Sequence, residues 1–186
     1  APFKYCHGGK KTQKNKTLNY KNKNKNKVNS CIAIMNPDIK IKNNNVEGKV
    51  EFIQNKKNLI INYEIYNLEN GLHGFHIHKC GDLSKSCSSG CEHFNPYNKT
   101  HGSLKGKHSH AGDLGNIISK NGESKGQIIT NKISINPCKT NSIIGRMVIV
   151  HRDEDDLGKG CNKESLITGN AGERLACGII GIKSWI

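Results

Sequence analysis

The sequence predicts an all-β domain built as an antiparallel sandwich or barrel, and three observations carry this prediction. From Val28 onward, short runs rich in β-branched residues alternate with Gly, Asn, Asp and Ser, the residues that favour turns. A period of two is clear where Val46, Val50 and Phe52 are separated by charged or polar residues. No segment with a helical period competes with these runs.

Eight runs are expected to form strands. In chain order they are residues 31–35, 46–54, 59–66, 74–80, 116–119, 127–135, 143–151 and 176–182. The first four combine Ile, Val, Leu, Phe and Tyr, and the fourth adds an alternating Phe-His-Ile-His. The last four are dominated by Ile and Val, which fit the pleated surface of a strand.

Two long stretches interrupt the strands. Residues 81–115 and 152–175 hold Gly, Asp, Asn, Ser and His with little strand pattern. Structureless connections of this length are uncommon in a compact domain and usually carry function. We therefore expect two long functional loops.

Length and charge bound the remaining possibilities. The 186 residues, 34% of them hydrophobic, suit one domain, and no apolar run approaches the roughly 20 residues that span a bilayer. No membrane insertion is therefore expected. The net charge of +14 favours an anionic partner, but its sign does not choose among nucleic acid, acidic surfaces and small anions.

Much of that charge lies at the amino-terminal end. Residues 1–27 hold nine Lys and no acidic residue, which leaves +5 for residues 28–186. We expect a disordered Lys/Asn-rich tail at 1–27 and the folded domain at 28–186. A solubilising arm and a polyanion contact both remain open for the tail. It lacks the apolar core of a secretory signal but begins with Ala1, so the compartment stays undecided, with cytoplasmic favoured over extracellular or virion-associated.

The histidines predict a metal centre. His76 and His78, two apart on an expected strand, point to the same face. Three nitrogens and one oxygen in the first long loop would close a tetrahedral zinc site; these donors are His93, His101, His110 and Asp113. His151 at the end of another strand would extend the histidine pair toward a copper site, with His93 able to bridge the two ions.

Taken in order, these motifs resemble the copper/zinc superoxide dismutase family. The resemblance runs from about Cys31 to Ile182 and rests on GLHGFHIH, Cys87 six residues before HFNP, AGDLGN, IIGRMVIVH, DDLGKG and TGNAGERLACGIIGI. It implies an eight-stranded antiparallel Greek-key barrel of the immunoglobulin-like sandwich type. It also implies disproportionation of superoxide to oxygen and hydrogen peroxide, with copper and zinc as cofactors.

The resemblance implies a role for each site residue. Copper would be held by His76, His78, His93 and His151, and zinc by His93, His101, His110 and Asp113. His93 would bridge the ions and carry a catalytic proton, and Arg174 would guide the anion. Asp155 would hydrogen-bond to both His76 and His101, and Cys87 would form a disulfide with Cys177.

The expected partners are the superoxide substrate, a second copy of the chain in a homodimer, and a copper chaperone. The competing hypothesis is a catalytically weak relative that binds or delivers metal. Cys31 is expected to be a small buried hydrophobe, and Cys91 either a stray metal ligand or a simple loop thiol. Cys80 stands where the family commonly has an aromatic residue at the dimer contact. The states of Cys6, Cys80, Cys138 and Cys161 stay open.

The remaining histidines receive ordinary roles. We expect His73 to form hydrogen bonds in the core, and His7 and His108 to be solvated.

Overall fold

Eight antiparallel strands follow one another in a nearly closed path in the computed structural model, which describes residues 27–185. The predicted tail therefore lies outside the described residues, except for Lys27. The strands of the path, in spatial order, are β6 (Asp113–Ser119), β4 (Gly71–His78), β8 (Met147–His151), β9 (Arg174–Ile179), β1 (Val28–Pro37), β2 (Glu47–Asn55), β3 (Asn58–Tyr66) and β7 (Glu123–Thr130). A further strand, β10 (Gly181–Trp185), pairs with β1 beside this path.

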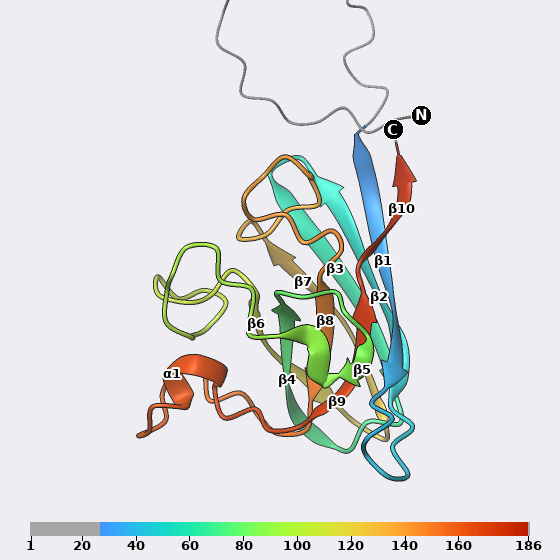
Figure 1. Ribbon diagram of the computed structural model, residues 1–186, viewed down its shortest axis with the longest axis vertical. Coiled ribbons are helices and arrows are strands. Elements are labelled where there is room, and N and C mark those ends of the chain that lie inside the picture. Colours follow the sequence, from blue (N-terminus) through green and yellow to red (C-terminus); the bar gives the residue numbers. More distant parts are fainter. Residues whose placement is uncertain (1–26, 186) are drawn as a thin grey trace, which may run out of the picture.

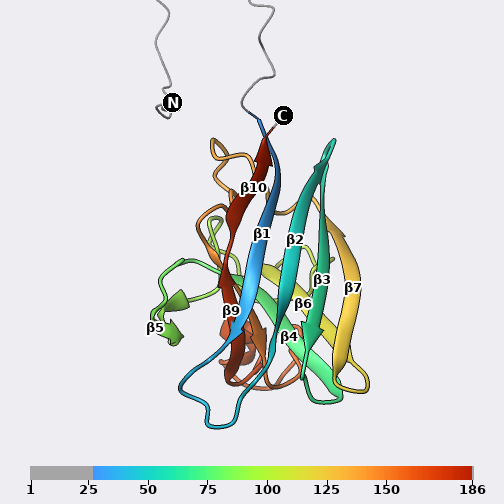
Figure 2. The same cartoon turned by 90° about the vertical axis from the view of Figure 1, so that its right-hand side faces the viewer.

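The connections are those of a Greek key. β3 and β4 follow one another in the chain but lie in different parts of the path, because β3 pairs with β2 and β7 whereas β4 pairs with β6 and β8. β1 joins the two layers, since it pairs with β2 and β10 along most of its length and with β9 at its end. Figure 2 shows one layer, from β10 to β7, crossing in front of the other. The predicted all-β Greek-key barrel is confirmed.

The period-two pattern predicted for the second strand is also confirmed. Val50 and Phe52 are fully buried, whereas Lys49 and Glu51 between them remain partly accessible. Both apolar side chains join the single large core cluster, which fills the space between the layers. The free energy gained by burying this face selects the register of β2, because a slip of one residue would turn the charged side chains inward.

Two predicted strands were too long. Residues 131–135 and 143–146 lie outside the strands, in irregular segments, although Ile133, Ile135 and Ile143 are buried. These isoleucines pack a loop onto the core, so their burial imitates the composition of a strand. The predicted run 176–182 is instead two strands, because the backbone of Ile180 pairs with Arg146 and Gly145 in the turn before β8.

The two long loops lie outside the barrel on one side (Figure 1). The first long loop, residues 79–112, contains the short strand β5 (Ser84–Cys87) and the turn η1 (Ser88–Gly90). The second long loop, residues 152–173, contains the one-turn helix α1 (Ser165–Thr168). None of the helices among residues 27–185 is long and apolar enough to cross a membrane.

Candidate metal centre

Strand pairing brings the histidines of distant segments together. His76 and His78 project from the same face of β4, and β4 pairs with β8, which ends at His151. On its other side β4 pairs with β6, where Asp113 lies opposite His76 in the register. The first long loop returns to this strand at an isolated bridge between His93 and His78. The strands of the barrel therefore supply four of the seven donors and the first long loop supplies the other three.

The first group of donors consists of four buried imidazoles. Its members, each of which offers one ring nitrogen within 4.8 Å of those of the others, are His76, His78, His93 and His151. The Nδ1 atoms of His78 and His151 lie 2.9 and 3.1 Å from backbone carbonyl oxygens, at Cys91 and Gly172 respectively. Those contacts hold the protons on Nδ1, so the two Nε2 atoms face one another, 3.3 Å apart, with free lone pairs.

The second group is centred on one carboxylate oxygen. Asp113 Oδ1 lies 2.9 Å from His93 Nδ1, 3.0 Å from His101 Nδ1 and 3.2 Å from His110 Nδ1. Its other oxygen, Oδ2, accepts hydrogen bonds from the backbone N–H groups of Gly102 and His110. The backbone thus fixes the carboxylate and leaves Oδ1 among three nitrogens, which is the donor set of a tetrahedral zinc ion.

Asp155 connects the two groups. Its Oδ2 lies 2.8 Å from His76 Nε2 and its Oδ1 2.7 Å from His101 Nε2, and the carboxylate is completely buried. Oδ1 also accepts a hydrogen bond from the backbone N–H of Leu157. Each histidine therefore keeps its proton on Nε2 and turns Nδ1 toward its own donor group.

Three nitrogens in the centre have no hydrogen-bond partner although they are buried. They are His76 Nδ1, His93 Nε2 and His101 Nδ1; the last lies 3.0 Å from Asp113 Oδ1 but not in hydrogen-bonding geometry. Leaving a buried polar atom unsatisfied is costly, so three such atoms aimed at two common points indicate groups that the protein is built to bind. The donor chemistry fits copper in the group of four imidazoles and zinc in the group with the carboxylate.

Electrostatics separate the two groups. Burial lowers the pKa of His76 and His78 well below its usual value, and lowers that of His151 to about 3, so these rings are neutral and able to ligate a metal at pH 7. At His101 burial acts in the same direction, but the adjacent carboxylates of Asp113 and Asp155 outweigh it and raise the pKa to about 9. Because of these carboxylates, the second group favours a positive charge more than the first group does.

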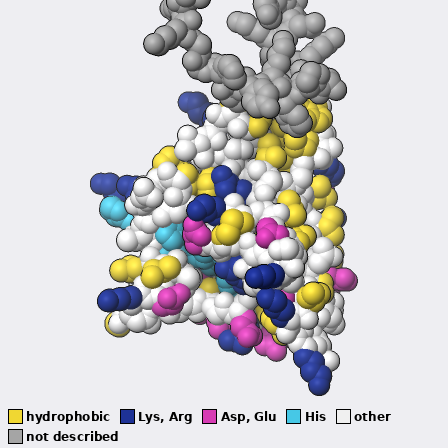
Figure 3. Space-filling model, in the orientation of Figure 1, with side chains coloured by type: hydrophobic (Ala, Val, Ile, Leu, Met, Phe, Trp, Pro, Cys, Tyr) yellow, Lys and Arg dark blue, Asp and Glu magenta, His cyan; other side chains and the backbone are white. Residues whose placement is uncertain are grey.

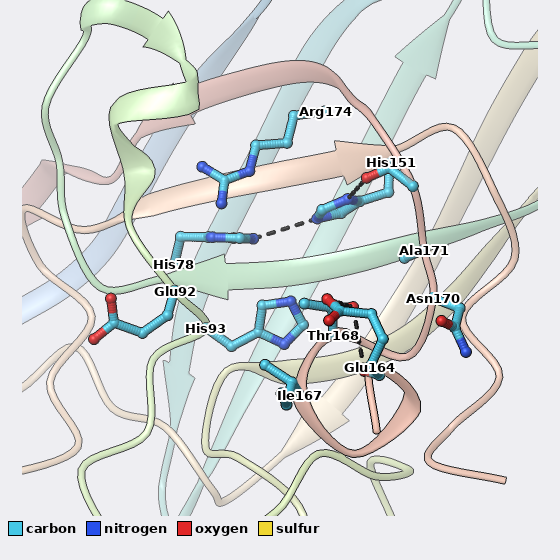
Figure 4. Close-up of a pocket in the computed structure, with 11 residues that line it drawn as sticks. His78, Glu92, His93, His151, Glu164, Ile167, Thr168, Asn170, Ala171 and Arg174 are labelled. Carbon is cyan, nitrogen blue, oxygen red and sulfur yellow. Dashed lines mark hydrogen bonds between the residues drawn. The ribbon is translucent and has the colours of Figure 1, made fainter. Parts of the chain in front are cut away.

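A pocket of about 330 Å³ opens onto the first group. Figure 3 shows histidine side chains reaching the surface in a hollow on this face, with both basic and acidic side chains around it. In the close-up, the Arg174 guanidinium lies beside His78 and His151 on one side, while Thr168 of α1 and Glu164, which precedes this helix, lie on the other (Figure 4). A small anion entering this pocket would meet a cationic side chain next to the four imidazoles.

Arg174 is held by backbone oxygens. Its Nη1 donates to the carbonyl of Cys87 at 2.8 Å, and its Nη2 donates to the carbonyl of Cys91 at 2.7 Å. No carboxylate within residues 27–185 forms an ion pair with it, because Glu173 pairs with Arg152 and Glu164 hydrogen-bonds to Thr168. Its charge therefore remains available to a bound anion.

The structure brings together every residue proposed for the site and adds one feature that the sequence reasoning missed. Cys87 forms a disulfide with Cys177, tying the first long loop to β9. A second disulfide joins Cys80 to Cys91, so both alternatives for Cys91, a metal ligand and a simple thiol, were wrong. The signal was two unassigned cysteines flanking the same loop, but sequence alone does not give disulfide connectivity.

The other cysteines and histidines have ordinary surroundings. Cys31 is free and buried, as predicted, and burial raises the pKa of its thiol to about 11. Cys161 is free and exposed, whereas Cys138 is disulfide-bonded. His73 is buried with its ring nitrogens 2.9 Å from the carbonyl oxygens of His151 and Glu69, and His108 is exposed, both as predicted. Cys6 and His7 lie outside the described residues.

Comparison with known proteins agrees with this geometry. Residues 46–180 match the family model described as copper/zinc superoxide dismutase (SODC). The chain is 45% identical to an extracellular Cu-Zn superoxide dismutase of Brugia pahangi, over 85% of this chain and 78% of that protein. It is 48% identical to Cu-Zn superoxide dismutase 5 of Dictyostelium discoideum, over 76% and 94%. It is 43% identical to a Cu-Zn superoxide dismutase of Paramecium bursaria Chlorella virus 1, over 89% and 84%.

Proposed function

Because the chain belongs to the copper/zinc superoxide dismutase family, we propose that its two donor groups divide these metals between them. The protein is an oxidoreductase that disproportionates superoxide: two superoxide ions and two protons give one oxygen and one hydrogen peroxide. Copper and zinc are its cofactors.

The proposed copper ligands are the four imidazoles of the first group: His76, His78, His93 and His151. The proposed zinc ligands are His93, His101, His110 and Asp113. The three unpartnered buried nitrogens carry this assignment, because no group of the described chain satisfies them. His93 can contribute one nitrogen to each position, since its Nδ1 lies beside Asp113, its Nε2 has no hydrogen-bond partner, and its ring lies 4.1 and 4.9 Å from the rings of His76 and His78.

When bound, copper supplies a one-electron couple that accepts an electron from one superoxide and returns it to the next. Arg174 supplies the binding contact for the anion, because its guanidinium lines the pocket beside the imidazoles and has no acidic partner. The carbonyls of Cys87 and Cys91 orient the guanidinium so that its charge faces the pocket.

We place the proton of the second half-reaction on His93 Nε2. This atom is buried, has no hydrogen-bond partner, and belongs to a ring that lines the pocket. The contact between His93 Nδ1 and Asp113 keeps the ring aimed while Nε2 gains or gives up the proton. The ring is thus placed both to ligate and to deliver a proton to the reduced substrate.

We also propose a homodimer and a copper chaperone as partners. Ile179 and Leu83 are exposed hydrophobic side chains, and Gly81 next to Cys80 packs beside Ile179. A second copy of the chain would cover this apolar surface. Sedimentation of Ile179→Glu against the parent tests the dimer, and copper loading with and without a chaperone protein tests the second partner.

Metal analysis together with a superoxide-decay assay tests the main assignment. The parent chain, supplied with both metals, is expected to hold one copper and one zinc and to remove superoxide rapidly. His93→Ala should lose metal from both positions and most of its activity, while His108→Ala, which changes an exposed histidine outside both groups, should keep both. Zinc alone in the copper-supplied parent, or full metal content in His93→Ala, would contradict the assignment.

A further inference from the structure

Cys91 has a backbone conformation that side chains other than glycine rarely adopt. Its φ is 62° and its ψ is −156°, at the end of the η1 turn. This region is open almost only to glycine, because a Cβ atom crowds the neighbouring peptide groups there. A non-glycine residue stays in it only when the surrounding structure holds it.

The Cys80–Cys91 disulfide supplies that restraint. Cys80 follows the end of β4 by two residues, and the disulfide fastens the loop to it. Two backbone hydrogen bonds join the same segments as the disulfide. The N–H of Cys80 donates to the carbonyl of Gly90 at 3.0 Å, and the N–H of Lys79 donates to the carbonyl of Glu92 at 2.9 Å. The segment around Cys91 is therefore laid along the strand that carries the paired histidines.

The constrained residue presents its carbonyl to two site residues at once. Cys91 O lies 2.9 Å from His78 Nδ1 and 2.7 Å from Arg174 Nη2. A carbonyl oxygen has two lone pairs, so these contacts use both. The orientation of a single peptide plane thus sets the tautomer of one imidazole and the direction of the guanidinium.

We propose that the Cys80–Cys91 disulfide is a positioning bond for the reaction, because it holds Cys91 in a conformation that aims one carbonyl at both His78 and Arg174. The inference rests on the proposed function. Without the bond, a non-glycine residue at position 91 relaxes toward a common φ, which turns its peptide plane and withdraws the shared acceptor. Cys91 acts through other residues and does not touch the substrate.

The Cys80–Cys91 disulfide could either stabilise the loop in general or hold the backbone of Cys91 at its unfavourable φ. If the disulfide only stabilises the loop, removing it should impair the protein equally whichever residue replaces Cys91. If the disulfide holds an unfavourable φ, removing it should impair a protein with alanine at position 91. The impairment should be much smaller with glycine at that position, since glycine adopts that φ freely. Two double variants, Cys80→Ala/Cys91→Ala and Cys80→Ala/Cys91→Gly, differ by one methyl group and both lack the bond and its thiols.

Both variants are compared with the parent as full chains loaded with copper and zinc. The alanine pair is expected to show a kcat/KM for superoxide about three- to tenfold lower, the effect of weakening one charge-assisted contact. It should also bind azide, an inert anion, more weakly and give an altered copper(II) EPR spectrum. The glycine variant should return all three readouts toward the parent, even though it too has lost the crosslink.

Two results would overturn the inference: an alanine pair that matches the parent in EPR spectrum and azide affinity, or a glycine variant as impaired as the alanine pair. If the alanine pair does not fold, Cys80→Ser, which keeps Cys91 in place, is compared with the glycine variant in the same assays. The NMR signal of the His78 Nδ1 proton in the zinc-loaded, copper-free protein gives a readout independent of turnover. A parent that binds no copper would instead refute the proposed function.

Discussion

Arg174 differs from Arg152, the residue that follows His151, in what balances its charge. Arg152 forms ion pairs with Asp153 and Glu173 at the surface, whereas Arg174 donates only to backbone carbonyls among the residues described. A carbonyl orients a guanidinium without cancelling its charge. Arg174 can therefore bind an anion without first giving up a carboxylate.

Replacing Arg174 should affect the substrate and not the metals. We expect Arg174→Ala to lower kcat/KM for superoxide by about ten- to a hundredfold, since one charge-assisted contact contributes roughly 1.5–3 kcal/mol. Copper and zinc contents should stay at the parent's level because the side chain contacts no donor group. Arg152→Ala, which removes a paired surface arginine, serves as the control. Loss of copper from Arg174→Ala, or an equal effect of Arg152→Ala, would rule out the guiding role.

At the level of elements, the second long loop is fitted closely around Asp155. Gly169 ends α1 with a positive φ of 69°, and a Cβ there would collide with Asp155 Oδ1 and His101 Nε2. Glycine is therefore required here for two reasons: its φ is positive, and the absence of a Cβ leaves room for the hydrogen bond between Asp155 and His101.

Gly169→Ala should displace the Asp155 carboxylate and weaken metal retention. Gly122→Ala is the matched control, because Gly122 also has a positive φ, 79°, but a Cβ there meets no atom within 4 Å. Both changes are expected to lower the melting temperature through backbone strain, but only Gly169→Ala should release zinc to a chelator faster. Equal zinc release from the two variants would show that Gly169 matters for its φ alone.

The Cys87–Cys177 disulfide acts on the first long loop as a whole. It closes a segment of 90 residues, and chain entropy predicts a stabilisation of about 4.6 kcal/mol for a loop of that size. Cys87→Ser should thus lower the melting temperature of the metal-free protein under oxidising conditions, and less so with both metals bound, because zinc also anchors this loop.

Cys161→Ser is its control, since Cys161 is free and exposed. Metal-free Cys87→Ser and Cys161→Ser melting at the same temperature would show that the disulfide contributes little.

The sequence predicts the elements that repeat a simple pattern and misses those defined by a single contact. Period-two burial locates β2, and His-x-His places two donors on one face of β4. β5, η1 and α1 are too short to show a period, and the division between β9 and β10 depends on Ile180 pairing with a turn. The Cys80–Cys91 bond depends on which segments meet in space, which spacing alone does not determine.

For the molecule as a whole, most of the net charge lies in the amino-terminal part of the sequence. Residues 1–27 contribute nine of its positive charges, and residues 28–186 carry only +5. At an ionic strength of 0.1 M, charges are screened beyond about 10 Å. The field that a superoxide ion meets at the pocket should therefore come mainly from nearby residues such as Arg174.

Deleting residues 1–27 should accordingly change kcat/KM less than Arg174→Ala does at 0.1 M salt. If the tail binds polyanions, the deletion should instead abolish salt-sensitive retention on a heparin column while metal content and activity persist. A larger activity loss from the deletion than from Arg174→Ala would assign the substrate-attracting field to the tail.

One carboxylate and one imidazole link the two proposed metal positions: Asp155 contacts a histidine of each group, and His93 offers a nitrogen to each. Occupying either position therefore changes the donors seen by the other. Thermodynamics then requires that zinc raise or lower the association constant of copper by the same factor by which copper changes that of zinc. In the proposed centre the two ions would be heterotropic effectors of one another, and the order in which they are loaded would not alter the free energy of the doubly loaded protein.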